Sequence, residues 1–312
     1  MGATAPLPSA TTAGDEPRKG GRHAERSRRL GGVFLGIPVI GWMLIFFAVP
    51  YFLLLLQSFW EPGPFGTVHN WNLDNYKMVF TGDELVGDTY LPTLLKSIKI
   101  GALVTLFSTL LAFPLAYLLA FKIRNTRTRM ALYTLVIVPL WASYLLRAYA
   151  WKVILGQDGL FSSVLDKVGL ENTFLNDLLY SQWAVIIAMT HIFTPFMVLT
   201  IYAILERLPK NLIEASKDLG VGRLRTFRNV VLPLSAPGVV AGATFTMGLS
   251  TGDFVAPQLV GGKSDVMIAN QIYSQFGATN NWPLGAAIAF VLLAFVAILV
   301  AISTLAERRE LV

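Results

Sequence analysis

The chain has 312 residues, of which 54% are hydrophobic and only 14% are charged, and its mean hydropathy is +0.57. About a quarter of the residues of a soluble domain are charged, so this chain has more apolar surface than a soluble core of its length can bury. The absence of cysteine excludes disulfides, thiol catalysis and zinc–thiolate sites, and the three histidines leave little material for a metal cluster.

The N-terminal residues 1–32 are rich in Ala, Thr, Pro, Gly and Arg, and we expect them to form a disordered basic cytoplasmic tail before a transmembrane domain over 33–312. The apolar segment Val33–Phe59 follows a basic region, as a signal peptide does. It is too long for a signal-peptide core, and no clear small-residue cleavage site follows it. We therefore expect this segment to remain as the first membrane helix.

Membrane helices need about 20 mostly apolar residues to cross the hydrocarbon core. The segments that satisfy this requirement are Val33–Phe59, Ile100–Phe121, Met130–Ala150, Trp183–Leu205, Pro237–Phe254 and Leu284–Leu305. The fifth is short and rich in Gly, Ser and Thr. The predicted fold class is therefore an all-α membrane protein with six transmembrane helices.

The positions of Lys and Arg predict the orientation of these helices. Basic residues gather before the first segment, between the second and third, between the fourth and fifth, and after the last. Bacterial-type membrane proteins place such residues in the cytoplasm, so we expect a plasma (inner) membrane protein with both termini cytoplasmic. The formal charge of +6 then reflects topology and does not indicate nucleic-acid binding.

The first outer segment, Trp60–Leu91, carries several aromatic residues among Asp and Gly. Such residues form belts at the membrane interface. They could equally form a docking face for an extracytoplasmic partner, and both interpretations can hold together.

The cytoplasmic segment 209–233 has the pattern of two short amphipathic helices that form an elbow. Asn211 can cap the N-terminus of the first helix, and the side chain of Glu214 can bond back to the amide of Asn211. Gly220 is expected to end this helix. Apolar residues recur at helical spacing in the second helix, which we expect Leu232-Pro233 to end at the membrane. The pattern alone is equally consistent with helices that insert into a groove of another protein and with helices that lie on the membrane surface.

The elbow also carries a resemblance. The run Glu214-Ala215-Ser216-Lys217-Asp218-Leu219-Gly220, then nine residues and Val230-Val231-Leu232-Pro233, resembles the EAA motif of binding-protein-dependent ABC importer permeases. Ser216 replaces the second alanine of that motif, and Val230 replaces isoleucine. In that family the motif forms the coupling helix, which transmits closure of the ATPase to the membrane helices. The residues that the resemblance implies for this role are Glu214, Ala215, Ser216, Asp218, Leu219, Gly220 and Arg223.

The block Asn70–Tyr76 resembles a segment found in many permeases of this class. Three further blocks are similar to permeases of the spermidine/putrescine type: Pro139–Trp151, Gly252–Gly262 and Asn281–Ala287. Permeases for ferric iron, sulfate and opines share parts of these blocks, so these substrates remain alternatives. The resemblance implies inward transport of a polyamine by alternating access.

Polyamines are cations, so a pathway for them should offer carboxylates and aromatic faces. Asp253 is the acidic residue placed within a predicted membrane segment, and such residues mark functional sites. It could instead be solvated at the outer mouth or paired with Arg147. The aromatic candidates for the pathway are Trp141, Tyr144, Tyr149 and Trp151. These residues could also simply pack or anchor the helices, and His191 is interpreted as a hydrogen-bonded interhelical residue.

Other classes of protein fit the sequence less well. Gly262-Lys263-Ser264 ends like a P-loop, but Pro257 occupies the position of the first glycine. A membrane-embedded enzyme would need a catalytic motif that is not present, so no catalytic or metal residues are assigned. A stand-alone secondary transporter or channel would leave the elbow unexplained.

The resemblance implies that this chain works with other subunits. The expected partners are a cytoplasmic ABC ATPase dimer that binds ATP and Mg, a second permease subunit that is a homologous heterodimer partner, and an extracytoplasmic substrate-binding protein. Membrane lipid surrounds the chain, and we expect no cofactor in the chain itself.

Overall fold

The computed structural model describes residues 38–63, 66–81, 90–156, 159–161 and 178–310, together with residues 2, 163 and 167. The tail expected over 1–32 lies outside the described residues, apart from Gly2. The chain divides into two compact units, residues 1–54 and 55–312.

The first unit is described as helix from Pro38 onward. It contains the π-helical turn η1 (Leu44–Ala48) and the start of α2 (Val49–Gln57), which continues into the second unit. The run Pro38–Gln57 is long and apolar enough to cross a membrane. The first predicted segment is thus confirmed over these residues, while 33–37 lie outside the described part.

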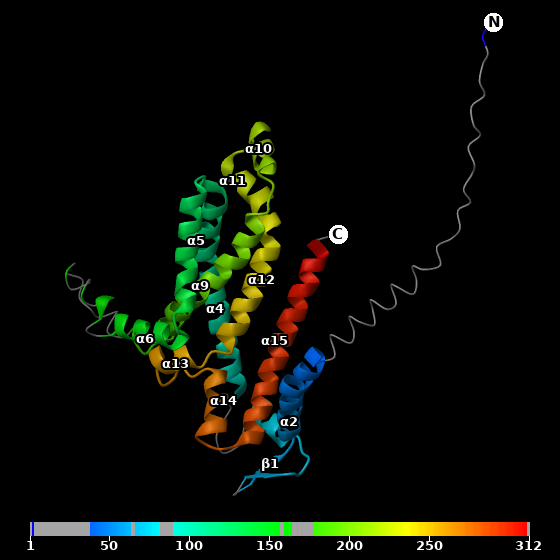
Figure 1. Cartoon of the computed structure of the whole chain (residues 1–312). Coiled ribbons are helices and arrows are strands. Elements are labelled where there is room, and N and C mark those ends of the chain that lie inside the picture. Colours follow the sequence, from blue (N-terminus) through cyan, green and yellow to red (C-terminus); the bar gives the residue numbers. More distant parts are fainter. Residues whose placement is uncertain are drawn as a thin grey trace. The chain divides into compact units, whose positions relative to one another are not determined.

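The core of the second unit is formed by α4 (Tyr90–Tyr117), α9 (Gln182–Leu205) and α12 (Leu232–Thr251), each packed against the other two (Figure 1). On α12 the residues that face this core are small and recur every fourth position: Gly238, Gly242, Thr246 and Ser250 are all buried. Lipid tails are as apolar as leucine, so membrane helices associate through close packing of such small residues. α15 (Trp282–Glu310) packs against α12 and against α14 (Ile268–Gly277).

The predicted number of membrane crossings agrees with the structure. Among the described residues, five helical runs are long and apolar enough to span a membrane, and one bent helix pair makes a sixth. The runs are Pro38–Gln57, Tyr90–Lys122, Gln182–Leu205, Arg223–Thr251 and Trp282–Leu305. The second begins well before the predicted Ile100, so Lys96 and Lys99 belong to α4 and not to an outer loop.

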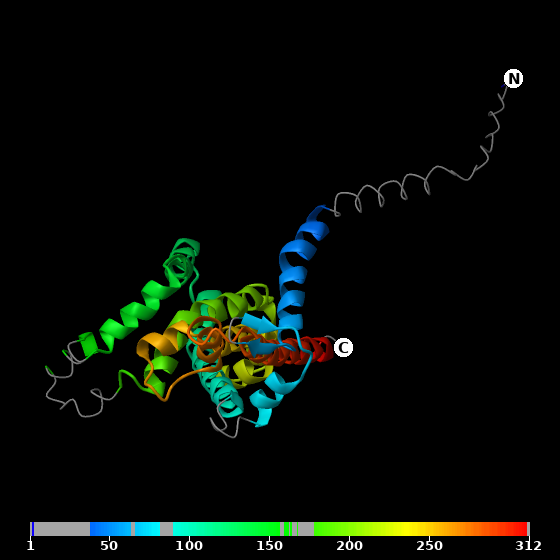
Figure 2. The ribbon, with the colours of Figure 1, turned by 90° about the horizontal axis from the view of Figure 1, so that it is seen from below.

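The third predicted segment, Met130–Ala150, is not one straight helix. It consists of α5 (Thr126–Trp141) and α6 (Tyr144–Ile154), which meet at 95° (Figure 2). Pro139 lies inside α5, and Ala142, the residue after the helix, adopts extended backbone angles of −73° and 145°. The chain therefore leaves the helix just beyond the proline.

The second helix of the elbow does not end at Leu232-Pro233. α11 (Arg223–Thr226), the π-helical turn η3 (Phe227–Val231) and α12 form one helical run over Arg223–Thr251. The N–H of Leu232 bonds to the carbonyl of Phe227, five residues back, in the wider π geometry. Pro233 directly follows this π-helical turn, and the helix continues through it to Thr251.

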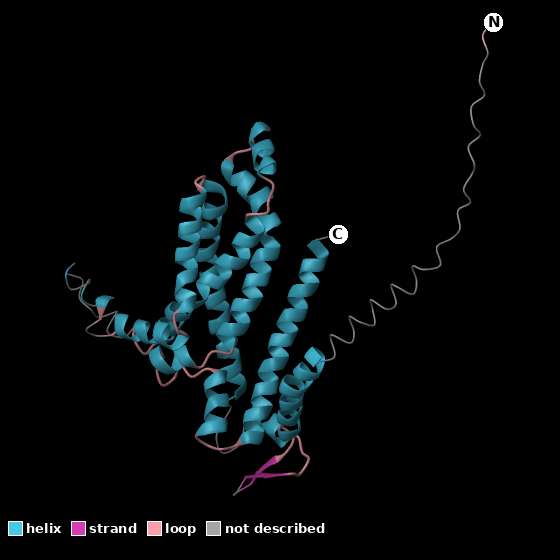
Figure 3. Ribbon diagram, in the orientation of Figure 1, coloured by secondary structure: helices cyan, strands magenta, loops and turns pink. Residues whose placement is uncertain are grey.

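The elbow and the β-hairpin lie at opposite ends of the second unit (Figure 3). α10 (Lys210–Asp218) and α11 form the elbow at one end. At the other end lie α13 (Val255–Val260), α14, and the antiparallel hairpin of β1 (Glu61–Gly63) and β2 (Gly66–Val68). α3 (Asp74–Thr81) follows the hairpin and packs against α15.

The contact between α9 and α12 is sensitive to side-chain size. A Cβ at Gly238 would lie 2.9 Å from the carbonyl oxygen of Thr200 and 2.8 Å from Cγ1 of Ile204. We predict that Gly238→Ala lowers the free energy of unfolding by about 1–3 kcal/mol, because backbone cannot yield as a flexible side chain does. Thermal unfolding of the purified protein in detergent measures this change.

The matched control for that substitution is Gly248→Ala on the same helix. A Cβ there would meet only Cγ1 of Val296, at an ordinary 3.7 Å. Stability should therefore be unchanged or slightly raised. Equal losses in the two variants would show that the close approach at Gly238 does not determine the packing.

Candidate functional site

The first arm of the elbow, α10, begins at Lys210, and the N–H of Leu212 bonds to the carbonyl of Pro209. The predicted cap Asn211 is therefore inside the helix, and a capping box with Glu214 at that position is wrong. Proline pre-sets the backbone angle of a helix start, which explains why the helix begins directly after Pro209.

The predicted stop at Gly220 is confirmed. Gly220 has a φ of 72°, in the left-handed region that favours glycine. The N–H of Val221 bonds to the carbonyl of Ser216 at 3.1 Å. This is the six-to-one bond of a Schellman motif, which satisfies a carbonyl that the end of the helix would otherwise leave unpaired.

A buried hydroxyl pair joins the two arms of the elbow. Oγ of Ser216 and Oγ1 of Thr226 lie 2.9 Å apart, and both residues are buried. Thr226 also donates to the carbonyl of Gly222 at 3.3 Å. The serine that replaces the second alanine of the EAA motif thus makes a contact that alanine could not make.

The inner side of the elbow packs against the bundle. Ile213 and Phe227 contact an apolar cluster that contains Val231. The ring of Phe227 meets the edge of Phe113 at 5.5 Å and that of Tyr117 at 5.9 Å. The predicted apolar face of the second arm is therefore buried only in part.

The tip of the elbow exposes apolar side chains. Leu219 is 82% exposed and Leu224 is 81% exposed, although sequence periodicity assigned Leu224 to the same face as Phe227 and Val231. The members of the coupling set that are exposed are Glu214, Ala215, Asp218, Leu219, Gly220 and Arg223. Ser216 is the buried member. The structure thus leaves most of this set open to a partner.

The candidate pathway residue Asp253 lies just beyond α12 and is only 8% exposed. It accepts a hydrogen bond from the hydroxyl of Tyr144, and its Oδ1 accepts one from the amide of Val255 at 2.9 Å. Arg147 lies over the ring of Tyr144 and donates to the carbonyl of Ile192 at 3.2 Å. Neither the solvated position nor the ion pair with Arg147 is therefore seen in the described part of the chain.

The remaining aromatic candidates are not gathered around Asp253. Trp141 is 84% exposed at the end of α5, and Tyr149 is 52% exposed with Lys152 over its ring. Trp151 donates from Nε1 to Nδ1 of His191 at 3.1 Å, which confirms His191 as a hydrogen-bonded residue between α6 and α9. The structure thus brings Tyr144 to Asp253 but not the other three.

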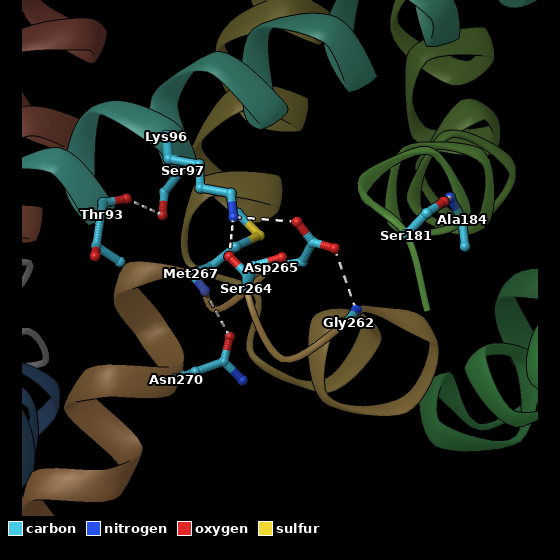
Figure 4. Close-up of polar contacts among 10 residues, drawn as sticks. All are labelled: Thr93, Lys96, Ser97, Ser181, Ala184, Gly262, Ser264, Asp265, Met267 and Asn270. Atoms are coloured by element: carbon cyan, nitrogen blue, oxygen red, sulfur yellow. Dashed lines mark hydrogen bonds and ion pairs between the residues drawn. The ribbon is translucent and has the colours of Figure 1, made fainter. Parts of the chain in front are cut away.

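Sequence analysis did not identify a polar staple at the end of the bundle opposite the elbow (Figure 4). Lys96 of α4 pairs with Asp265 at 3.1 Å and also donates to the carbonyl of Ser264. The other carboxylate oxygen of Asp265 accepts from the amide of Gly262 at 3.2 Å. These contacts fix the loop between α13 and α14 to the start of α4. No local pattern could pair residues so distant in sequence.

Two neighbouring bonds secure the end of this loop, and Figure 4 shows the one between Met267 and Asn270. The amide of Ile268 donates to Oγ of the buried Ser97 at 2.8 Å, and the amide of Met267 donates to the side chain of Asn270 at 3.1 Å. A cavity of about 900 Å³ lies beside the loop, and its lining includes Tyr180, Gln258, Lys263, Gln271 and Tyr273. The loop beside this cavity is therefore held in place by the staple.

Residues 112–311 match the family described as binding-protein-dependent transport system inner membrane component. The chain belongs to this family. It is 34% identical to the inner membrane ABC transporter permease protein YdcU of Escherichia coli, over 88% of this chain and 92% of that protein. It is also 34% identical to the spermidine/putrescine transport system permease protein PotB of Escherichia coli, over 82% of this chain and 90% of that protein.

Solved structures support the fold of this family. A bacterial ABC transporter involved in alginate import is 18% identical and has a TM-score of 0.66, covering 92% of this chain and 98% of that chain. The methionine ABC transporter MetNI is 18% identical with a TM-score of 0.54, covering 73% of this chain and 99% of that chain. The permease class and a multi-pass inner-membrane location are thus confirmed.

The elbow of this permease should depend on the left-handed backbone of Gly220. A β-carbon there is strained by about 1–2 kcal/mol, so Gly220→Ala should loosen the Schellman turn. We predict that amide hydrogen exchange over 210–226 becomes roughly 5–30 times faster. Hydrogen-exchange mass spectrometry of the full chain measures this rate.

The control for Gly220→Ala is Gly222→Ala, two residues away. Gly222 has a φ of −64°, and a Cβ there would meet no heavy atom within 4 Å. Exchange should stay at the wild-type rate in this variant. Faster exchange in both variants would mean that the effect does not come from the backbone angle.

Proposed function

We propose that this permease moves polyamines such as spermidine and putrescine inward, driven by a separate ATPase. The proposal of a polyamine substrate rests on the 34% identity with the spermidine/putrescine permease PotB over most of both chains. Ferric iron, sulfate and opines remain the alternative substrates within the same class of permease.

The chemistry of Asp253 supports a cationic substrate. The carboxylate is buried, its hydroxyl partner Tyr144 presents an aromatic ring, and this ring already carries a cation–π contact with Arg147. A carboxylate beside an aromatic face suits an ammonium group. In this proposal an incoming ammonium group displaces Arg147 from the ring and pairs with Asp253.

The elbow over 209–233 is proposed as the coupling site. Its exposed leucines, Leu219 and Leu224, offer an apolar anchor, and Glu214 and Arg223 offer charges beside it. Such a helix suits a groove in a partner protein. Because Arg223–Thr251 is one helical run, movement of the elbow passes directly into α12.

The transport system requires further subunits, as the description of the family as binding-protein-dependent indicates. We propose a cytoplasmic ABC ATPase dimer that binds ATP and Mg, and a homologous second permease subunit. A substrate-binding protein would dock on the outer face, which carries the hairpin and α14. One similar structure by fold is an alginate transporter in complex with a periplasmic protein.

The substrate is tested by ATPase stimulation in the assembled transporter. The complex in lipid nanodiscs is mixed with its binding protein and, separately, with spermidine, putrescine, ferric iron, sulfate or an opine. We predict that only the polyamines stimulate ATP hydrolysis. Stimulation by ferric iron or an anion alone would leave the assignment as a permease intact but would rule out a polyamine as the substrate.

The role of Asp253 is tested by Asp253→Asn. Asparagine keeps the shape and can still accept from Tyr144 and Val255, but it removes the charge. We predict a rise of roughly 10–100-fold in the KM for spermidine uptake, as expected for the loss of a hydrogen bond to a charged group. Uptake by proteoliposomes measures KM.

Tyr149→Phe serves as the control, because Tyr149 is exposed and its ring contacts Lys152. It should leave the KM for spermidine unchanged. An unchanged KM in Asp253→Asn as well would remove this residue from the pathway while leaving the permease assignment intact.

A further inference from the structure

A small cavity of about 190 Å³ lies between the first turns of α5 and the last turn of α9. Its polar lining is formed by Arg129, Tyr133, Tyr202, Glu206 and Arg207. The cavity lies at the same end of the bundle as the elbow, because Glu206 directly follows α9 and α10 begins at Lys210. It belongs neither to the coupling set nor to the surroundings of Asp253.

The charges of this cavity are arranged around one carboxylate. Oε1 of Glu206 accepts a hydrogen bond from the hydroxyl of Tyr202 at 2.8 Å, and it lies 3.8 Å from a guanidinium nitrogen of Arg129. The ring of Tyr202 lies 4.8 Å from that of Tyr133. The contact of 3.8 Å is an ion pair but is too long for a hydrogen bond.

The two arginines leave the cavity with an excess of positive charge. Arg129 and Arg207 carry two positive charges against the single carboxylate of Glu206. Among the described residues, no hydrogen bond from either guanidinium is found. Guanidinium groups with unused donors match the oxygen atoms of a phosphate.

The depth of the cavity in the membrane identifies the source of that phosphate. α9 is long and apolar enough to cross a membrane, and α5 is the first half of the bent pair that could make a sixth crossing. α5 begins at Thr126 and α9 ends at Leu205, so the cavity lies where the apolar part of both helices ends. Tyrosine is common at this level, where lipid headgroups surround the protein. Basic pockets between membrane helices on the cytoplasmic side bind anionic headgroups.

We propose that this cavity binds the headgroup phosphate of an anionic phospholipid. Arg129 and Arg207 would donate to the phosphate oxygens. Glu206 would hold the hydroxyl of Tyr202 and limit the net charge of the site. The alternative ligand is a cation, with an ammonium group bound between the tyrosine rings and Glu206. The positive charges of the two neighbouring arginines disfavour such a ligand. The site does not depend on which substrate the permease moves.

The position of this site gives it a link to the elbow. Glu206 and Arg207 follow α9 directly, and α10 begins only a few residues later at Lys210. A headgroup bound here would restrain the connection between α9 and the elbow.

The test uses the assembled transporter in nanodiscs that contain equal amounts of phosphatidylglycerol and phosphatidylethanolamine. Native mass spectrometry after transfer to detergent then counts the lipids retained. We expect wild type to retain phosphatidylglycerol preferentially. In the double variant Arg129→Gln/Arg207→Gln, this retention should fall by about fivefold for each arginine removed.

The matched control is Arg124→Gln/Arg127→Gln, which removes the same charge from exposed positions outside the cavity. It should retain phosphatidylglycerol as wild type does. Glu206→Gln should raise retention, because it removes the repulsive carboxylate. Equal losses in both double variants, or a loss in Glu206→Gln, would overturn the proposal.

Two further outcomes would also overturn it. Displacement of the retained phosphatidylglycerol by spermidine, with wild-type binding of spermidine lost in Glu206→Gln, would show a cation site. Cross-linking of Met130→Cys to the second permease subunit would show that the cavity is a contact between subunits.

Discussion

The structure depends on the close approach of α12 to its neighbours. Membrane helices gain no hydrophobic driving force from each other, so their contacts depend on how closely the backbones can meet. Gly238 and Gly242 on α12 allow contact with α9, and Gly101 on α4 allows contact with Thr251 near the end of α12. The same helix continues without a break into the elbow. The proposed coupling site is therefore continuous with a helix that packs closely against α9 and α4.

The sequence could predict the number of membrane segments and the chemistry of the elbow, because both depend on local pattern. The length of an apolar segment identifies a membrane helix. Gly220 ends the first helix of the elbow because glycine can adopt the left-handed backbone conformation. Boundaries were less predictable. The break after Pro139 and the passage through Pro233 involve the same residue type with opposite outcomes. The π-helical turn before Pro233 decides the second case, and no composition rule indicates it.

The features that the sequence could not predict are contacts between distant segments. The staple of Lys96 with Asp265 joins α4 to a loop near the other end of the chain. The environment of Asp253 likewise comes from Tyr144 on a different helix. Periodicity identifies which residues face inward, but it does not say which of them meet. The resemblance to a family supplied the role of the elbow, whereas the partner of Ser216 required the structure.

The continuous helical run Arg223–Thr251 has a mechanical consequence. At 1.5 Å per residue, about 25 Å of helix separates Arg223 from the glycine contact near residue 240, and about 16 Å separates that contact from Thr251. The run is thus held at two points, by Gly238 and Gly242 against α9 and by Gly101 against Thr251. A sideways push on the elbow can therefore tilt α12 only if the contact with α4 moves with it.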